Sequence, residues 1–193
     1  MPNLFVIGGC NGAGKTTASL NILPEILDCK EFVNADTIAY GLNPLMPESV
    51  AFEAGKIFLN RINELISERK DFAVESTLAS KSLANIIHKA RKSGYKINLI
   101  YFWLQNYEIA IKRVAERVKL GGHNIPEEVI LRRYYRGINN FFEIYCKISD
   151  YWIVIDNTFE KIVYVAEGNK EIITELKDNE RWDKLINIIN DNK

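Results

Sequence analysis

The feature that most constrains the fold of this chain is the segment Gly9-Cys10-Asn11-Gly12-Ala13-Gly14-Lys15-Thr16. Two glycines separated by four residues and followed by Lys and Thr form the phosphate-binding loop pattern. The glycines let backbone N–H groups turn inward around phosphates, Lys15 supplies positive charge, and the Thr16 hydroxyl can bind Mg²⁺. The pattern predicts that ATP is bound by Gly9, Asn11, Gly12, Ala13, Gly14, Lys15, Thr16 and Thr17.

The residues around this motif have the pattern that such a loop requires, with a buried strand before it and a helix after it. Leu4–Ile7 is a short apolar run, and the segment after Lys15 places Leu20, Leu23 and Leu27 at helical spacing. A glycine-rich turn with an incidental lysine would need neither neighbour. The order of strand, loop and helix therefore favours the phosphate-binding interpretation.

Composition indicates a globular protein without a net charge. The chain has 193 residues, so we expect one domain over residues 1–193, and its 25 basic residues balance its 25 acidic residues. This balance argues against a nucleic acid or a membrane as partner, although residues 112–136 carry a local excess of basic side chains.

The cysteines and the apolar runs indicate a cytoplasmic protein. Cys10, Cys29 and Cys146 are scattered, with no metal-binding spacing and no disulfide framework, as in a reducing compartment. Nothing before the loop resembles a signal peptide, and the longest apolar run, Ile97–Leu104, is too short to span a bilayer.

Apolar runs and helical stretches alternate along the chain as they do in βαβ units. The runs are nearly continuous, which indicates strands buried on both faces of a parallel sheet. The expected strands are Leu4–Ile7, Phe32–Val33, Phe72–Val74, Ile97–Trp103 and Trp152–Ile155. Further along, residues 161–166 and 172–175 flank Glu167-Gly168-Asn169, which predicts a hairpin with its turn at these three residues.

Acidic residues that follow the second and third strands are candidates for catalysis, because ligands of open α/β sheets lie outside the carboxyl ends of the strands. Asp36 is placed to accept the proton of a substrate hydroxyl or to help hold Mg²⁺, and the alternative is that it caps a short helix over residues 37–40. Glu75 is placed near Mg²⁺ or a substrate hydroxyl. The alternative is that it belongs to a turn that satisfies the hydrogen bonds at the N-terminus of the next helix.

Five arginines lie on two expected helices, one over residues 107–119 and one that begins at Pro126. Gly121-Gly122-His123-Asn124 joins the helices, and we interpret residues 107–140 as a lid that closes over phosphates with the glycine pair as hinge. His123 is interpreted as a loop residue that contacts substrate or solvent. Solvated salt bridges are the alternative for at least two of the arginines, which are Arg113, Arg117, Arg132, Arg133 and Arg136.

These residues together resemble the zeta-toxin-like P-loop kinases, whose best-known members phosphorylate UDP-N-acetylglucosamine on a sugar hydroxyl. The resemblance runs from the loop through the arginine-rich region and weakens after Asn157. It implies Asp36 as catalytic base, Glu75 and Thr77 in the substrate pocket, and lid arginines on the ATP phosphates. We assign Lys15, Asp36, Arg117 and Arg133 to catalysis, Asp36, Glu75, Thr77 and Arg132 to the substrate, and Thr16 to the metal.

The pattern and the resemblance together predict an α/β fold of the P-loop NTPase class. We expect a nucleotide-kinase-like, five-stranded parallel sheet in the order 2-3-1-4-5, with helices on both faces and a C-terminal hairpin. The resemblance further implies ATP and Mg²⁺ as cofactors, a hydroxyl-bearing small molecule such as a UDP-amino sugar as substrate, and an antitoxin protein as partner.

The chain departs from the toxin pattern at several positions near the proposed base. Asn34 stands where the toxins usually carry a second Asp, Ile38–Gly41 replaces a polar, His-containing stretch, and Asn11 replaces a common Pro. The run Gly121–Pro126 is closer to a branch labelled as predicted ATPases. An ATPase, or a nucleotide or nucleic-acid kinase without a toxin role, therefore stays open as the alternative.

Overall fold

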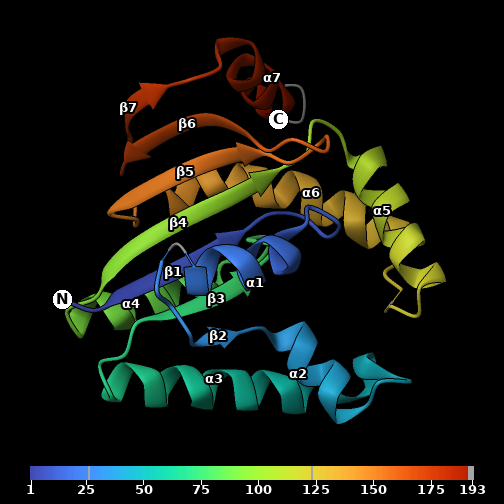
Figure 1. Ribbon diagram of the computed structural model, residues 1–193, viewed down its shortest axis with the longest axis vertical. Coiled ribbons are helices and arrows are strands. Elements are labelled where there is room, and N and C mark those ends of the chain that lie inside the picture. Colours follow the sequence, from blue (N-terminus) through green and yellow to red (C-terminus); the bar gives the residue numbers. More distant parts are fainter. Residues whose placement is uncertain (26, 123, 191–193) are drawn as a thin grey trace.

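The computed structural model describes residues 1–25, 27–122 and 124–190. Its strands form one sheet in the order β2-β3-β1-β4-β5-β6-β7 (Figure 1). The strands are β1 (Asn3–Gly8), β2 (Phe32–Val33), β3 (Phe72–Ser76), β4 (Lys96–Trp103), β5 (Tyr151–Asp156), β6 (Val163–Asn169) and β7 (Ile172–Leu176). The helices are α1 (Lys15–Glu25), α2 (Ala35–Leu42), α3 (Ala51–Ser67), α4 (Ser82–Lys92), α5 (Tyr107–Lys119), α6 (Glu127–Asn140) and α7 (Asn179–Asn190). A 3₁₀ turn, η1 (Pro47–Val50), precedes α3, and a π-helical turn, η2 (Phe141–Tyr145), follows α6.

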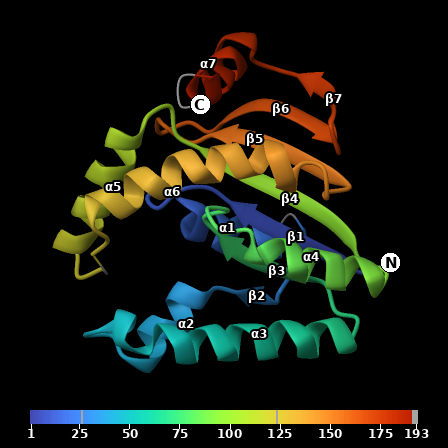
Figure 2. The ribbon, with the colours of Figure 1, turned by 180° about the vertical axis from the view of Figure 1, so that it is seen from behind.

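The sheet confirms the predicted fold class and strand order. Strands β1 to β5 pair in parallel in the order 2-3-1-4-5, and β6 and β7 add antiparallel to β5, so the hairpin extends the sheet to seven strands. The parallel strands are covered on both faces. Helix α1 lies in front of the sheet in Figure 1, whereas α4 and α6 lie in front of it in the opposite view of Figure 2.

Burial explains why these apolar runs became central strands. Successive side chains of β1 point to opposite faces, and Leu4, Phe5, Val6 and Ile7 are all buried, so both faces of this strand meet helices. No helix in the described part of the chain is both long enough and apolar enough to cross a membrane.

The hairpin forms as expected, but the predicted turn position is wrong. Gly168 pairs with Trp152 inside the ladder instead of lying in the turn, and a side chain there would meet the indole ring, with Trp152 Cε2 only 2.7 Å from an added Cβ. The turn falls two residues later, where Lys170 has a φ of 54° and its carbonyl accepts the indole N–H of Trp152 at 2.7 Å. This glycine provides space for a tryptophan, and sequence alone reads it as a turn residue.

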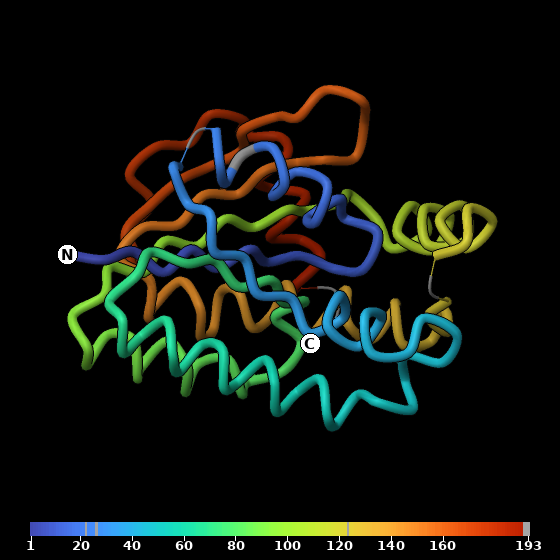
Figure 3. Tube along the Cα trace, turned by 60° about the horizontal axis from the view of Figure 1, so that its bottom comes forward, coloured from blue at the N-terminus to red at the C-terminus, as the bar shows by residue number. Residues whose placement is uncertain are grey.

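The carboxyl ends of the five parallel strands meet at one edge of the sheet. The loop after β1, helix α2 and the C-terminal end of α5 lie at that edge, opposite the N-terminus (Figures 1 and 3). Candidate site residues that follow β1, β2 and β3 are therefore brought together, as the rule for open α/β sheets predicts.

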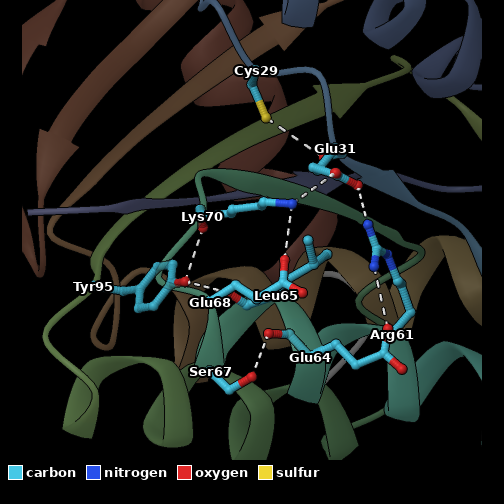
Figure 4. Close-up of polar contacts among 9 residues, drawn as sticks. All are labelled: Cys29, Glu31, Arg61, Glu64, Leu65, Ser67, Glu68, Lys70 and Tyr95. Atoms are coloured by element: carbon cyan, nitrogen blue, oxygen red, sulfur yellow. Dashed lines mark hydrogen bonds and ion pairs between the residues drawn. The ribbon is translucent and has the colours of Figure 1, made fainter.

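A polar network lies at the opposite end of the sheet, next to the start of the short strand β2 (Figure 4). The Glu31 carboxylate, next to β2, accepts from Arg61 Nη2 of α3 at 2.7 Å and lies 4.0 Å from Lys70 Nζ. Tyr95 Oη donates to the carbonyls of Leu65 and Lys70 at 2.9 and 2.8 Å, which joins the end of α3 to the start of β4. Strand β2 has only two residues, and the contacts of Glu31 hold its start against α3.

Candidate active site

The loop between β1 and α1 has the backbone shape of a phosphate-binding loop. Gly12 and Gly14 have φ values of 75° and 82°, in the left-handed region that favours glycine. The loop is also tightly packed, because a Cβ at Gly12 would lie 2.8 Å from the carbonyl oxygen of Ala110 on α5 and a Cβ at Gly14 would collide with the side chain of Asn157.

A cavity of about 440 Å³ opens above this loop, and we call it the phosphate cradle. Of the predicted nucleotide residues, those that line it are Asn11, Gly12, Gly14, Lys15, Thr16 and Thr17. Gly9 and Ala13 lie in the buried part of the loop, where the Ala13 carbonyl accepts from Asn157 Nδ2 at 2.8 Å. The remaining walls include Asp36, Glu75, Arg113 and Arg117.

Glu75 connects Lys15 and Thr16 of the loop to the end of β3. Thr16 Oγ1 donates to Glu75 Oε2 at 2.7 Å, and Lys15 Nζ lies 3.6 Å from Glu75 Oε1 while donating to the carbonyl of Cys10 at 2.8 Å. Lys15 is only 6% exposed. Its charge is thus held at the floor of the cradle by one carboxylate and one carbonyl.

Thr16 and Glu75 together have the chemistry of a Mg²⁺ site. Mg²⁺ takes hard oxygen ligands and is usually bound by one or two protein groups with phosphates and waters completing its shell. A hydroxyl and a carboxylate oxygen side by side in the phosphate cradle fit that requirement. Clusters of three or more His, Cys, Asp or Glu side chains suited to a metal do not occur among the described residues.

Asp36 lies at the start of α2, and its interpretation as the helix cap is wrong. The cap is Asn34, whose Oδ1 accepts from the backbone N–H groups of Asp36 and Thr37 at 2.8 and 3.3 Å. The Asp36 carboxylate is exposed and makes no hydrogen bond or ion pair within the described residues. It is therefore available to a ligand.

A second cavity, of about 510 Å³, adjoins the phosphate cradle and runs between α3 and α4. We call it the acceptor trench. Lys15, Asn34, Asp36 and Glu75 line both cavities, so the loop lysine and the free carboxylate lie where the two meet. The predicted substrate residue Thr77 lines the trench, next to Ser76.

The arginines divide between the cavities. Arg133 lines the trench, and its Nη1 donates to Asn11 Oδ1 at 3.1 Å, which connects α6 to the phosphate loop. Arg117 lines the cradle. Arg132 lines neither of these two cavities; it lies with Arg117, Arg133 and Asp36 in a third cavity of about 490 Å³, between η1 and the start of α6, which we call the arginine cleft. His123, interpreted above as a loop residue in contact with ligand, lies outside the described residues.

Two residues near the cradle were absent from the predicted site. Arg113, named only as a lid arginine, donates to the carbonyls of Gly12 at 3.4 Å and Thr158 at 3.0 Å. Asn157, directly after β5, holds the Ala13 carbonyl. The signal for Asn157 was present, because the rule applied to the ends of the second and third strands applies equally to the fifth.

Cys10, inside the loop, is an inert thiol. It is 3% exposed, and burial raises its pKa to about 11 in spite of the nearby Lys15 charge. The thiol therefore stays protonated at neutral pH, and proximity to loop amides does not make it a nucleophile.

Comparison with known proteins gives a family match over most of the chain. The family model described as zeta toxin matches residues 47–176, from η1 through β7. An uncharacterized protein from Haemophilus influenzae is 33% identical over 128 residues, which cover 65% of this chain and 88% of that protein.

Solved structures share the fold at low sequence identity. A crystal structure of AvrRxo1-ORF1:AvrRxo1-ORF2 with sulphate ions matches with a TM-score of 0.77 and 17% identity, over 96% of this chain. This chain spans 63% of the length of that one. The PezAT chromosomal toxin–antitoxin system of Streptococcus pneumoniae matches with a TM-score of 0.66 and 15% identity, over 99% of this chain and 87% of that chain. At these identities the similarity shows the fold alone.

Proposed function

This chain belongs to the zeta-toxin family, and we propose that it is an ATP-dependent kinase that phosphorylates a hydroxyl group of a small molecule. The observation that carries the proposal is the position of Asp36. Its exposed, unpaired carboxylate lies where the phosphate cradle meets the acceptor trench, two cavities that Lys15 also lines. A phosphoryl-transfer site needs a proton acceptor between its donor and acceptor pockets.

In the proposed reaction, a hydroxyl in the trench gives its proton to the Asp36 carboxylate as its oxygen bonds to the γ-phosphorus of ATP. The bond between that phosphorus and the β–γ bridging oxygen breaks, and ADP leaves with the electron pair. Asp36 suits this role because no side chain of the described residues occupies its oxygens. Positioning and charge neutralisation supply most of the acceleration in such transfers.

The cationic groups around the cradle would neutralise the charge of the transferred group. Lys15, the loop glycines and Arg117 line the cavity in which the phosphates would bind, and Arg133 lines the trench on the acceptor side. Bound Mg²⁺ would be held by Thr16 and Glu75 and would supply further positive charge to the phosphate oxygens. In this proposal Arg132, in the arginine cleft, contacts the acceptor molecule away from its reacting hydroxyl.

Finer features of the proposal rest on the family. We propose a UDP-amino sugar as the first acceptor to assay, since the best-known members of the family phosphorylate one. We propose an antitoxin protein as partner, since the structurally similar PezAT is a toxin–antitoxin system. The three buried, unpaired thiols support a reducing, cytoplasmic location.

The test compares Asp36→Asn and Lys15→Ala with the unaltered protein. We expect Asp36→Asn to bind ATP with unchanged affinity and to lose transfer by a factor of about 100 or more, since a general base contributes that much. Lys15→Ala should lose both ATP binding and transfer. Transfer of radiolabelled γ-phosphate to UDP-sugars, nucleosides and simple alcohols, with ATP affinity from calorimetry, measures both effects.

Two results would count against the proposal. Full transfer activity in Asp36→Asn would remove the base, and ATP turnover that proceeds equally without any alcohol would favour the ATPase alternative. Asp183→Asn, which changes a carboxylate on the distant helix α7, is the matched control and should behave as the unaltered protein.

A further inference from the structure

The walls of the acceptor trench are more apolar than phosphoryl transfer to a small polyol requires. Beyond the catalytic end, α3 and α4 line it with Phe52, Phe58, Leu59, Leu83 and Ile86. Phe52 is 78% exposed and Leu59 is 49% exposed, although the same helix buries Ala54, Ile62, Leu65 and Ile66 in the core. Large apolar side chains left open to water beside a catalytic carboxylate indicate a ligand that covers them.

Gly55 leaves space at the centre of this wall. It lies inside α3, between Phe52 and Leu59 on the face that lines the trench, and a Cβ added there would meet no atom within 4 Å. Glycine is unfavourable in a helix interior, and neither backbone shape nor crowding explains it here, because its φ is ordinary and its surroundings are open. The glycine keeps the trench wide at this point.

The charge on the wall limits what can lie there. Lys56 lines the trench, and its Nζ lies 4.4 Å from the centroid of the Phe52 ring. The acidic residues that line the trench, Asp36 and Glu75, are at the catalytic end. The Lys56 ammonium would repel a positively charged group between the two helices, whereas it would not repel a neutral or anionic ring.

We propose that the phosphoryl acceptor is an alcohol that carries a flat apolar group without positive charge, and that this group lies over Gly55 between Phe52, Leu59 and Ile86. The inference rests on the proposed kinase function, because the trench is identified as the acceptor site through Asp36. It makes Gly55 a specificity-determining residue: the absence of a side chain there admits the ring.

The experiment fills the trench without unfolding the helix. Gly55→Leu places a side chain in the open space and replaces a poor helix former with a good one, so the melting temperature should be unchanged or higher. Asn60→Leu adds the same side chain at an exposed position of α3 that lines none of the three cavities, and it is the matched control. The probe is 1-anilinonaphthalene-8-sulfonate, an anionic flat aromatic molecule whose fluorescence rises in apolar sites.

We expect the unaltered protein and Asn60→Leu to bind the probe with equal affinity. Gly55→Leu should bind it with an affinity lower by a factor of about 10 or more, as is usual when a ligand no longer fits an apolar pocket. ATP affinity should be the same in all three. Failure of the unaltered protein to bind the probe, or equal binding by Gly55→Leu, would overturn the inference. The kinase proposal can fail separately. If the variants differ as expected in probe binding but no alcohol is phosphorylated, the trench binds an apolar ring and the proposed kinase reaction is wrong.

Discussion

At the scale of single residues, Asn11 has a role that the motif does not predict. The loop pattern assigns it to the nucleotide, and it does line the cradle, but the residue is only 4% exposed and its Oδ1 accepts from Arg133 at 3.1 Å. The two residues are 122 positions apart in the chain, so no local spacing could have paired them. Asn11 thus holds the guanidinium of Arg133 against the loop.

Replacement of Asn11 by Ala should release Arg133 without removing a phosphate ligand. We expect kcat to fall by about 10–100-fold, since displacement of a charge by about 1 Å has costs of that order, with little change in KM for ATP. Steady-state kinetics of Asn11→Ala beside Asn21→Ala, an exposed asparagine on α1, measures this split. A large rise in KM for ATP with unchanged kcat would instead make Asn11 a nucleotide ligand.

At the scale of elements, the position of Asp36 depends on where α2 begins. Asn34 and Asp36 are both good helix caps two residues apart, and sequence patterns locate a helix start only to within a few residues, so the sequence could not choose between them. The structure begins α2 at Ala35, with Asn34 as cap. Because Asn34 is the cap, the Asp36 carboxylate is free for the role that we propose for it.

Asn34→Ala should therefore affect stability and activity together. The cap accepts hydrogen bonds from two N–H groups, so its loss should lower the free energy of unfolding by about 1 kcal/mol. Phosphoryl transfer should also decrease, because the start of α2 would no longer hold Asp36 in one position. Asn34→Ser keeps a capping oxygen and should retain most of both. Urea unfolding with transfer assays on the two variants is the measurement, and equal stability of Asn34→Ala and the unaltered protein would contradict the role of the cap.

Much of the sheet could be predicted because its strands are buried on both faces and leave continuous apolar runs. The boundaries of α5 were predicted to the residue, since Asn106 caps its start through Ile109 N–H and the Gly pair follows its end. The sequence could not show which of the two neighbours Arg132 and Arg133 contacts the loop, because only the packing of α6 brings Arg133 to Asn11.

At the scale of the whole molecule, the last helix is connected to the phosphate loop at the start of the chain. The Asp156 carboxylate, at the end of β5, is 1% exposed and accepts from Gln105 Nε2 at 2.8 Å, Thr158 N at 2.9 Å and Arg181 Nε of α7 at 2.9 Å. The adjacent Asn157 holds the Ala13 carbonyl of the loop. Both α7 and the loop lie outside residues 47–176, so the family match does not include this connection.

Arg181→Ala should test whether α7 supports the nucleotide site. Removal of the guanidinium leaves Asp156 buried with its charge uncompensated, so we expect the free energy of unfolding to fall by about 2 kcal/mol or more. ATP should also bind several-fold more weakly, because Asn157 follows Asp156 directly. Lys184→Ala on the same helix, whose ion pair with Glu180 is exposed, should change neither quantity measurably. Urea unfolding and calorimetric ATP titration of both variants decide the question: if Arg181→Ala loses stability but keeps full ATP affinity, α7 stabilises the sheet without reaching the loop.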